Sequence, residues 1–166
     1  MAEPSGPRVS ICFVCLGNIC RSPTAEGVVR HLLQQAGLDQ HVSVESAGTA
    51  DYHRGELPDR RSRAAARARG VDLSSRARQF TATDWQGLDY VLAMDRANFE
   101  ALSALAPDAA ARAKLRLFRD FDPASPAASE VPDPYHGGPE GFEHVLDLCE
   151  AAGRGLLEQL RREHGL

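Results

Sequence analysis

The sequence has no long hydrophobic run, and this absence limits where the chain can work. None of its apolar stretches approaches the roughly 18 residues that a membrane-spanning helix needs. The first residues, MAEPSGP, have no apolar centre of the kind found in signal peptides. Residues 1–7 are therefore predicted to be a disordered lead-in, and the protein is predicted to be soluble and cytoplasmic.

Positive charge is also scarce. Nineteen Lys and Arg residues stand against 23 Asp and Glu residues, the formal net charge is -4, and Lys114 is the only lysine. A chain of this kind has no electrostatic attraction for nucleic acid or for an anionic membrane. The sequence therefore predicts neither as a partner.

Cysteine is limited to four residues, Cys12, Cys15, Cys20 and Cys149. No histidine cluster accompanies them, so they do not form a zinc pattern, and no metal or cofactor is expected. Cys12 falls in a predicted strand and Cys149 on the apolar face of the predicted last helix, so both are expected to pack in the core. Cys15 and Cys20 remain as candidates for chemistry.

What the chain does contain is a regular alternation of predicted strands and helices. Its 166 residues, 43% of them hydrophobic, suffice for one domain with a sizeable core, predicted over residues 8–166. Strands joined by helices favour parallel pairing with right-handed crossovers. The prediction is an α/β, Rossmann-like fold, a four-stranded parallel sheet with helices on both faces. Its strands are expected near 9–15, 41–48, 88–94 and 115–118, and its helices near 22–36, 58–69, 95–106 and 138–162.

Residues 8–27 carry the most informative local pattern. An apolar, β-branched run predicts a buried strand that ends at Cys15. After a short glycine-containing loop, Ser22 is expected to cap a helix, with Pro23 at its first position and Glu26 in its first turn. A strand, a loop and a helix N-terminus in this order direct backbone N–H groups into one concavity, which predicts an anion site.

Two side chains would make this anion site reactive. Cys15 at the strand end and Arg21 at the helix start are both expected to face the concavity. Such surroundings lower a cysteine pKa from about 8.5 to roughly 3.5–7.5, which favours the nucleophilic thiolate. Arg21 offers a planar fork that can hold two oxygens of a phosphate. The pattern thus predicts a nucleophile beneath a bound oxyanion.

The stretch CLGNICRSPTAEG, with Asp-Pro-Tyr at 133–135, closely resembles the low-molecular-weight protein tyrosine phosphatases, and the resemblance runs from about residue 8 to 160. It implies hydrolysis of phosphotyrosyl proteins or peptides through a cysteinyl-phosphate intermediate. Cys15 would be the nucleophile, Arg21 and loop amides would bind phosphate, and Asp133 would be the general acid and base. The other loop positions implied in phosphate binding are Leu16, Gly17, Asn18, Ile19, Cys20 and Ser22.

The resemblance also implies supporting residues, each with a simpler structural reading. Ser46 would hydrogen-bond the loop, or merely cap a turn. Asp95 would orient Arg21 and Ser22, or cap the helix that it precedes. Tyr52 and Tyr135 would form the two walls of the pocket, since an exposed ring can stack on a phosphotyrosyl ring.

Asp133 can also be singled out from its neighbours. It lies in the Pro-rich stretch between the fourth strand and the last helix, and long loops of this kind are usually functional or disordered. Pro134 favours an extended backbone before it and would hold the carboxyl out over a neighbouring pocket. A phosphate ester needs such an acid, because its leaving oxygen must be protonated. Asp120 and Asp122 lack the flanking Pro-Tyr, and a plain Asp-Pro turn is the simpler reading.

Three other functions share parts of this pattern. Arsenate reductases resemble the loop but need further cysteines, and residues 21–148 contain none. Phosphoarginine phosphatases resemble it with Thr where this chain has Ile19, and an apolar Ile19 suits an aryl ester better than a guanidinium. A non-catalytic phosphate-binding module would not need Cys15, Arg21 and Asp133 together.

Some positions depart from the family or stay open. Ser75 stands where the family often has a histidine that supports the loop, which leaves the support of Asn18 undecided. His136 stands where a second tyrosine often follows Tyr135. The resemblance implies that Cys20 can form a reversible disulfide with Cys15, although the two thiols could simply coexist. A monomer is expected.

Overall fold

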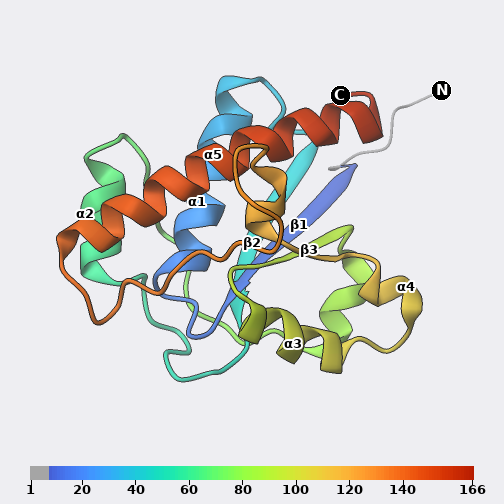
Figure 1. The fold of residues 1–166 in the computed structure, drawn as a ribbon, viewed down its shortest axis with the longest axis horizontal. Helices are drawn as coiled ribbons and strands as arrows, with labels where there is room; N and C mark the ends of the chain where they lie inside the picture. The colour runs from blue at the N-terminus through green and yellow to red at the C-terminus, as the bar shows by residue number, and fades with distance from the viewer. Residues whose placement is uncertain (1–7) are drawn as a thin grey trace.

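A computed structural model describes residues 8–166, and the lead-in expected at 1–7 lies outside them. Its centre is one parallel sheet with strand order β2-β1-β3-β4 (Figure 1), which confirms the predicted α/β class. The strands are β1 (Val9–Cys15), β2 (Val42–Gly48), β3 (Tyr90–Ala93) and β4 (Leu115–Leu117). Within the described chain, no helix is long and apolar enough to cross a membrane.

Helices cover both faces of this sheet. Figure 1 shows α1, α2 and α5 on one side and α3 and α4 on the other. The α-helices are α1 (Arg21–Gln35), α2 (Arg60–Arg67), α3 (Arg96–Leu105), α4 (Ala109–Arg112) and α5 (Pro139–His164). Two 3-10 helices, η1 (Ala82–Gly87) and η2 (Phe118–Phe121), complete the set.

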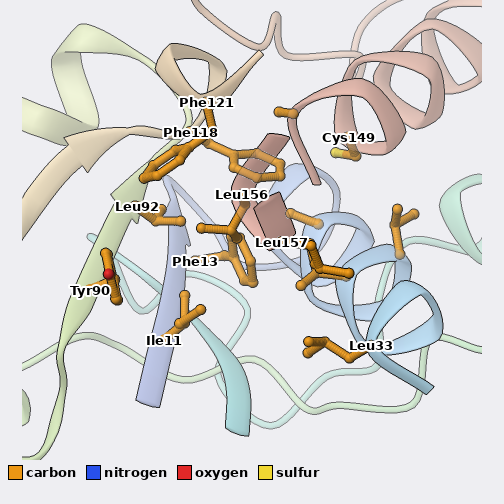
Figure 2. Close-up of a cluster of buried hydrophobic side chains, with 14 of the residues drawn as sticks. Ile11, Phe13, Leu33, Tyr90, Leu92, Phe118, Phe121, Cys149, Leu156 and Leu157 are labelled. Carbon is orange, nitrogen blue, oxygen red and sulfur yellow. The ribbon is translucent and has the colours of Figure 1, made fainter. Parts of the chain in front are cut away.

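The central strand β1 sends alternate side chains into two hydrophobic cores. Ile11 and Phe13 pack in the core beneath α1 and α5, where Figure 2 shows Phe13 close to Leu156. Cys12 and Val14 pack in the core on the opposite face. Residues 11–15 of this strand are buried on both faces of the sheet, which explains their continuous hydrophobic run.

The predicted packing role of two cysteines is confirmed. Cys12 and Cys149 are fully buried, and Figure 2 shows Cys149 on the inner side of α5. Burial raises the pKa of both thiols above the ordinary value. They are therefore poor candidates for chemistry.

The element boundaries differ from the predicted ones by a few residues. The second helix spans Arg60–Arg67 and is capped by Asp59, and the third strand is the shorter Tyr90–Ala93. Phe118, expected in the fourth strand, instead begins η2. Neither η1 nor α4 was predicted, because six and four residues are too few to show a helical period.

The predicted start of α1 is wrong in detail. The helix begins at Arg21, one residue before the expected cap, and Cys20 occupies the N-cap position without a side-chain capping bond. The hydroxyl of Ser22 lies next to Cys15 Sγ instead. Glu26 also lies past the first turn and has other partners, so the two residues that resembled a helix-start signal serve the loop before it.

Candidate active site

The loop between β1 and α1, residues 16–20, lies at the carboxyl edge of the sheet. This is the edge at which parallel α/β sheets bind ligands. Cys15 ends β1, and only 3% of its surface is exposed. Backbone bonds hold the loop to the segment after β2, since Thr49 N–H donates to Cys15 O and Ala50 N–H donates to Leu16 O. We call residues 16–20 the anion loop.

A cavity of about 130 Å³ opens above Cys15. It brings together three groups that are far apart in the sequence, the Cys15 thiol, the Arg21 guanidinium and the Asp133 carboxyl. The other residues lining it are Leu16, Gly17, Ile19, Cys20, Tyr52, His53, Tyr135 and His136. Of the residues predicted to bind substrate, Asn18 and Ser22 do not line this cavity, and both are buried.

Ser22 supports the reactive sulfur. Its Oγ lies 3.0 Å from Cys15 Sγ and accepts a hydrogen bond of 2.8 Å from Asn18 Nδ2. The Asn18 amide occupies an acceptor position of Ser22, and the single Ser22 proton has two acceptors within reach, Cys15 Sγ at 3.0 Å and Ala47 O at 3.3 Å. A hydroxyl that donates to the sulfur stabilises a thiolate more than a neutral thiol.

Asn18 has a left-handed backbone conformation, with φ 58°, which Asn adopts more readily than most residues. Its amide also donates to Ser46 Oγ at 3.0 Å, and its Oδ1 accepts from the Arg78 N–H at 3.0 Å. The support left undecided by Ser75 therefore comes from the Arg78 backbone. Four segments of the chain meet at this one buried amide.

Ser46 lies at the next position in this network. Its hydroxyl donates to Glu26 Oε1 at 2.6 Å, so its lone pairs face Asn18. Arg30 in turn holds Glu26 Oε2 at 2.6 Å. Ser46 thus supports the anion loop through Asn18, and Glu26, predicted in the first turn of the helix, instead orients Ser46.

Arg21 is held from behind by two acceptors. Its Nη1 donates to Asp95 Oδ2 at 2.6 Å and to Val131 O at 3.1 Å. Burial acts to lower the pKa of Arg21, but the charge of Cys15 and the bond from Asp95 outweigh it, and the pKa is raised. The guanidinium therefore stays charged in the cavity wall, and Asp95 also caps α3 through the Asn98 N–H.

Asp133 approaches the cavity from the long segment between η2 and α5, residues 122–138, which we call the acid loop. It is flanked by Pro132 and Pro134, whose rings restrict the backbone. Its Oδ1 accepts the Tyr135 N–H at 3.1 Å. Oδ2 is left as the oxygen that can carry a proton into the cavity.

Aromatic rings and imidazoles form the rim. Tyr52 is 73% exposed and Tyr135 is 39% exposed, so both rings are accessible for stacking on an aromatic ligand. His53 is fixed by Glu56, at 2.6 Å from Nδ1 to Oε2, and its ring centroid lies 6.5 Å from that of Tyr135. His136 packs edge-on against Tyr135 at 5.0 Å. The sequence indicated His136 only as a departure from the family after Tyr135 and gave no role to His53, and the structure places both in the cavity lining.

Cys20 lies in the wall of the same cavity. It is buried against Ile19, Ala77 and Phe142, and no disulfide is present in the described chain. Burial, followed by the charge of Asp59, raises the pKa of Cys20 to about 12. In this state Cys20 is a neutral thiol beside the nucleophile.

Gly48 explains how the loop can lie so close to β2. A Cβ at this position would lie 2.6 Å from Leu16 O and 2.9 Å from Ala50 O, distances that no real side chain shows. A glycine is needed there because two backbones approach each other. The sequence carries no local sign of this contact.

Comparison with known proteins identifies relatives over nearly the whole chain. The family model described as low molecular weight phosphotyrosine protein phosphatase matches residues 10–165. A low molecular weight protein-tyrosine-phosphatase of Streptomyces coelicolor is 46% identical over 154 residues, covering 92% of this chain and 94% of the relative. The human low molecular weight phosphotyrosine protein phosphatase is 38% identical over 151 residues, covering 90% and 94%.

A solved structure agrees with these relatives. The crystal structure of a protein tyrosine phosphatase from Entamoeba histolytica, with Hepes in its active site, matches with a TM-score of 0.89 at 38% identity. The match covers 95% of this chain and 99% of that one. The similarity therefore extends to the whole fold around the anion loop.

Proposed function

The chain belongs to the low molecular weight phosphotyrosine protein phosphatase family, and on this basis we propose that it hydrolyses phosphotyrosine on proteins through a cysteinyl-phosphate intermediate. The observation that carries the proposal is the meeting of Cys15, Arg21 and Asp133 in one cavity with a tyrosine-lined rim. A nucleophile, an anion holder and a proton donor are the three groups that such a reaction needs.

In the first step the Cys15 thiolate attacks phosphorus in line with the bond to the leaving oxygen. Arg21 and the N–H groups of the anion loop hold the other phosphate oxygens and stabilise their charge in the transition state. Asp133 Oδ2 protonates the leaving oxygen as the P–O bond breaks. The products of this step are the protein with its tyrosine hydroxyl restored and a phosphoryl group bound covalently to Cys15.

In the second step water displaces the sulfur. Asp133, now ionised, takes a proton from the attacking water, and inorganic phosphate is released. The Ser22 hydroxyl, 3.0 Å from Sγ, stabilises the departing thiolate. The Asn18 bond to Ser22 supports this role, because it fixes the hydroxyl beside the sulfur, where a thiolate would compete with Ala47 O, 3.3 Å away, for the Ser22 proton.

The cavity wall favours an aryl ester over a phosphorylated guanidinium. Ile19 presents an apolar side chain, while Tyr52 and Tyr135 present rings on which a phenyl ring can stack. Phosphoarginine is the alternative substrate, since its phosphate would fit the same loop. The cytoplasmic location and monomeric state expected from the sequence stay predictions.

Steady-state hydrolysis of matched phosphotyrosyl and phosphoarginyl peptides tests the proposal. We expect kcat/KM to be much larger for the phosphotyrosyl peptide. Asp133→Asn should lower turnover of that peptide by about 10²–10⁴, the usual contribution of a general acid. Equal or faster turnover of the phosphoarginyl peptide would contradict the assignment of substrate, and turnover of neither would favour a binding module.

A further inference from the structure

The acid loop is ordered by contacts that the mechanism above does not use. Asp122 accepts the Ala124 N–H at 2.9 Å and the Ser125 hydroxyl at 3.0 Å. The neighbouring Arg119 of η2 reaches across the loop, with Nη2 donating to Ser125 Oγ at 2.9 Å and Nη1 donating to Glu130 O at 2.9 Å. One guanidinium thus fixes both arms of the loop.

Glu130 connects the acid loop to the start of α3, where Asp95 binds Arg21. Its Oε2 accepts the Arg96 N–H at 2.8 Å, in the first turn of α3. The helix cap, Asp95, is the residue that binds Arg21. The side chain of Glu130 therefore contacts Arg96, the residue after Asp95, and Asp95 positions Arg21.

Val131 continues the same connection inside the protein. It is fully buried, its N–H donates to Met94 O at 2.7 Å, and its carbonyl accepts from Arg21 Nη1 at 3.1 Å. Only Pro132 separates it from Asp133. Because Pro132 has a fixed φ and restricts the backbone of Val131, the connection is stiff, and a displacement of Val131 would displace Asp133 by a similar amount.

From these contacts we propose that Arg119 and Glu130 are positioning residues for the general acid. They hold the acid loop so that Asp133 stands at a fixed place relative to Arg21. The proposal rests on the role of Asp133 proposed above. Within residues 8–166 the buried Nε of Arg119 has no acceptor. Burying this unpaired N–H costs free energy, which offsets part of what the two bonds of the guanidinium contribute to stability. A side chain kept for stability alone would more simply be apolar.

The dependence of rate on the leaving group tests this proposal. A misplaced acid harms substrates that need protonation, such as phenyl phosphate, whose phenol resembles the tyrosine side chain with its pKa of about 10. It matters little for p-nitrophenyl phosphate, whose anion leaves readily. We expect Arg119→Met to lower kcat/KM for phenyl phosphate about tenfold or more, and for p-nitrophenyl phosphate by less than about twofold.

Two matched variants separate positioning from general damage. Glu130→Ala should show the same selective loss, whereas Glu130→Gln, which keeps an oxygen for the Arg96 N–H, should be close to the parent. Arg119→Lys keeps one donor and should recover part of the loss. Equal loss on both substrates, or no loss on either, in folded Arg119→Met and Glu130→Ala would overturn the proposal.

Asp133→Asn serves as the reference in the same assay. If it shows strong dependence on the leaving group while Arg119→Met and Glu130→Ala do not, only the positioning proposal fails. If Asp133→Asn itself shows no such dependence, the assignment of Asp133 as the general acid fails. If Arg119→Met does not fold, the pair of Glu130 variants decides the question alone.

Discussion

Asn18 is the residue on which the shape of the anion loop depends most. It combines a positive φ of 58° with side-chain bonds to Ser22, Ser46 and the Arg78 N–H. Loss of these bonds leaves the Arg78 N–H unpaired and frees the Ser22 hydroxyl to turn away from the sulfur. The residue therefore affects both the stability of the loop and the reactivity of Cys15.

Asn18→Ala is expected to lower the free energy of unfolding by about 2–4 kcal/mol, from the strain of a positive φ and one unpaired buried donor. It should also lower kcat/KM by about 10- to 100-fold, because small displacements in a reacting site are costly. Urea unfolding and steady-state kinetics measure the two effects. Asn18→Gly tolerates the backbone but keeps none of the bonds, so it should recover stability in part and activity hardly at all. Full activity in Asn18→Gly would contradict the role given to the side chain.

Gly48 gives a second test at this scale. Gly48→Ala places a Cβ 2.6 Å from Leu16 O, so the anion loop must shift, at a cost of about 1–3 kcal/mol. We expect lower thermal stability together with a clear loss of kcat. Gly87→Ala is the matched control, since nothing lies within 4 Å of its Cβ position. If both variants behaved like the parent, the close approach of β2 and the loop would not matter.

At the scale of elements, the end of α5 is attached to β3 by a polar contact far from the active site. The Tyr90 hydroxyl donates to Glu163 and lies 2.9 Å from His164 Nε2. This hydrogen bond lowers the pKa of Glu163, so the bond contributes stability above the ordinary glutamate pKa and loses it as pH falls through the lowered one. The attachment of α5 is thus sensitive to acid.

Tyr90→Phe should therefore lower the free energy of unfolding by about 0.5–1.5 kcal/mol near neutral pH. At a pH well below the ordinary glutamate pKa of about 4.3, the difference in free energy of unfolding between Tyr90→Phe and the parent should become smaller. Urea unfolding at neutral pH and at the acid pH measures the difference in free energy of unfolding under each condition. Tyr135→Phe is the control, because within the described chain the Tyr135 hydroxyl has no hydrogen-bond partner. A difference that grew toward acid pH would contradict the sign argued here.

The sequence predicted the elements well where a periodic pattern is long, as in α5, and poorly where it is short, as in α4 and η1. It also indicated the strand, loop and helix around Cys15, because all the signals lie within residues 8–27. The Ser22 cap was misassigned for a related reason. A serine next to a helix start looks the same whether it caps the helix or faces a sulfur, and only the tertiary structure distinguishes the two.

At the scale of the whole molecule, the parallel sheet brings distant segments to one edge. Asp95 follows β3, Val131 lies beside Met94, and the Arg78 backbone N–H donates to Asn18 Oδ1. Contacts made by a backbone carbonyl or N–H leave no mark on residue type, so the sequence could not predict the roles of Val131 and Arg78. It indicated Asp133 through its flanking proline and family resemblance, but not the loop contacts beside it.

In the proposed mechanism Cys15 carries the phosphate between the two steps. This role can be tested by mass spectrometry of rapidly quenched Asp133→Ala enzyme after mixing with p-nitrophenyl phosphate, because this substrate forms the intermediate without the acid, whereas hydrolysis of the intermediate still lacks its base. We expect phosphate on the enzyme fragment that contains Cys15, and neither phosphate nor turnover in Cys15→Ala. Turnover retained in Cys15→Ala, or phosphate found only on another residue, would contradict the mechanism.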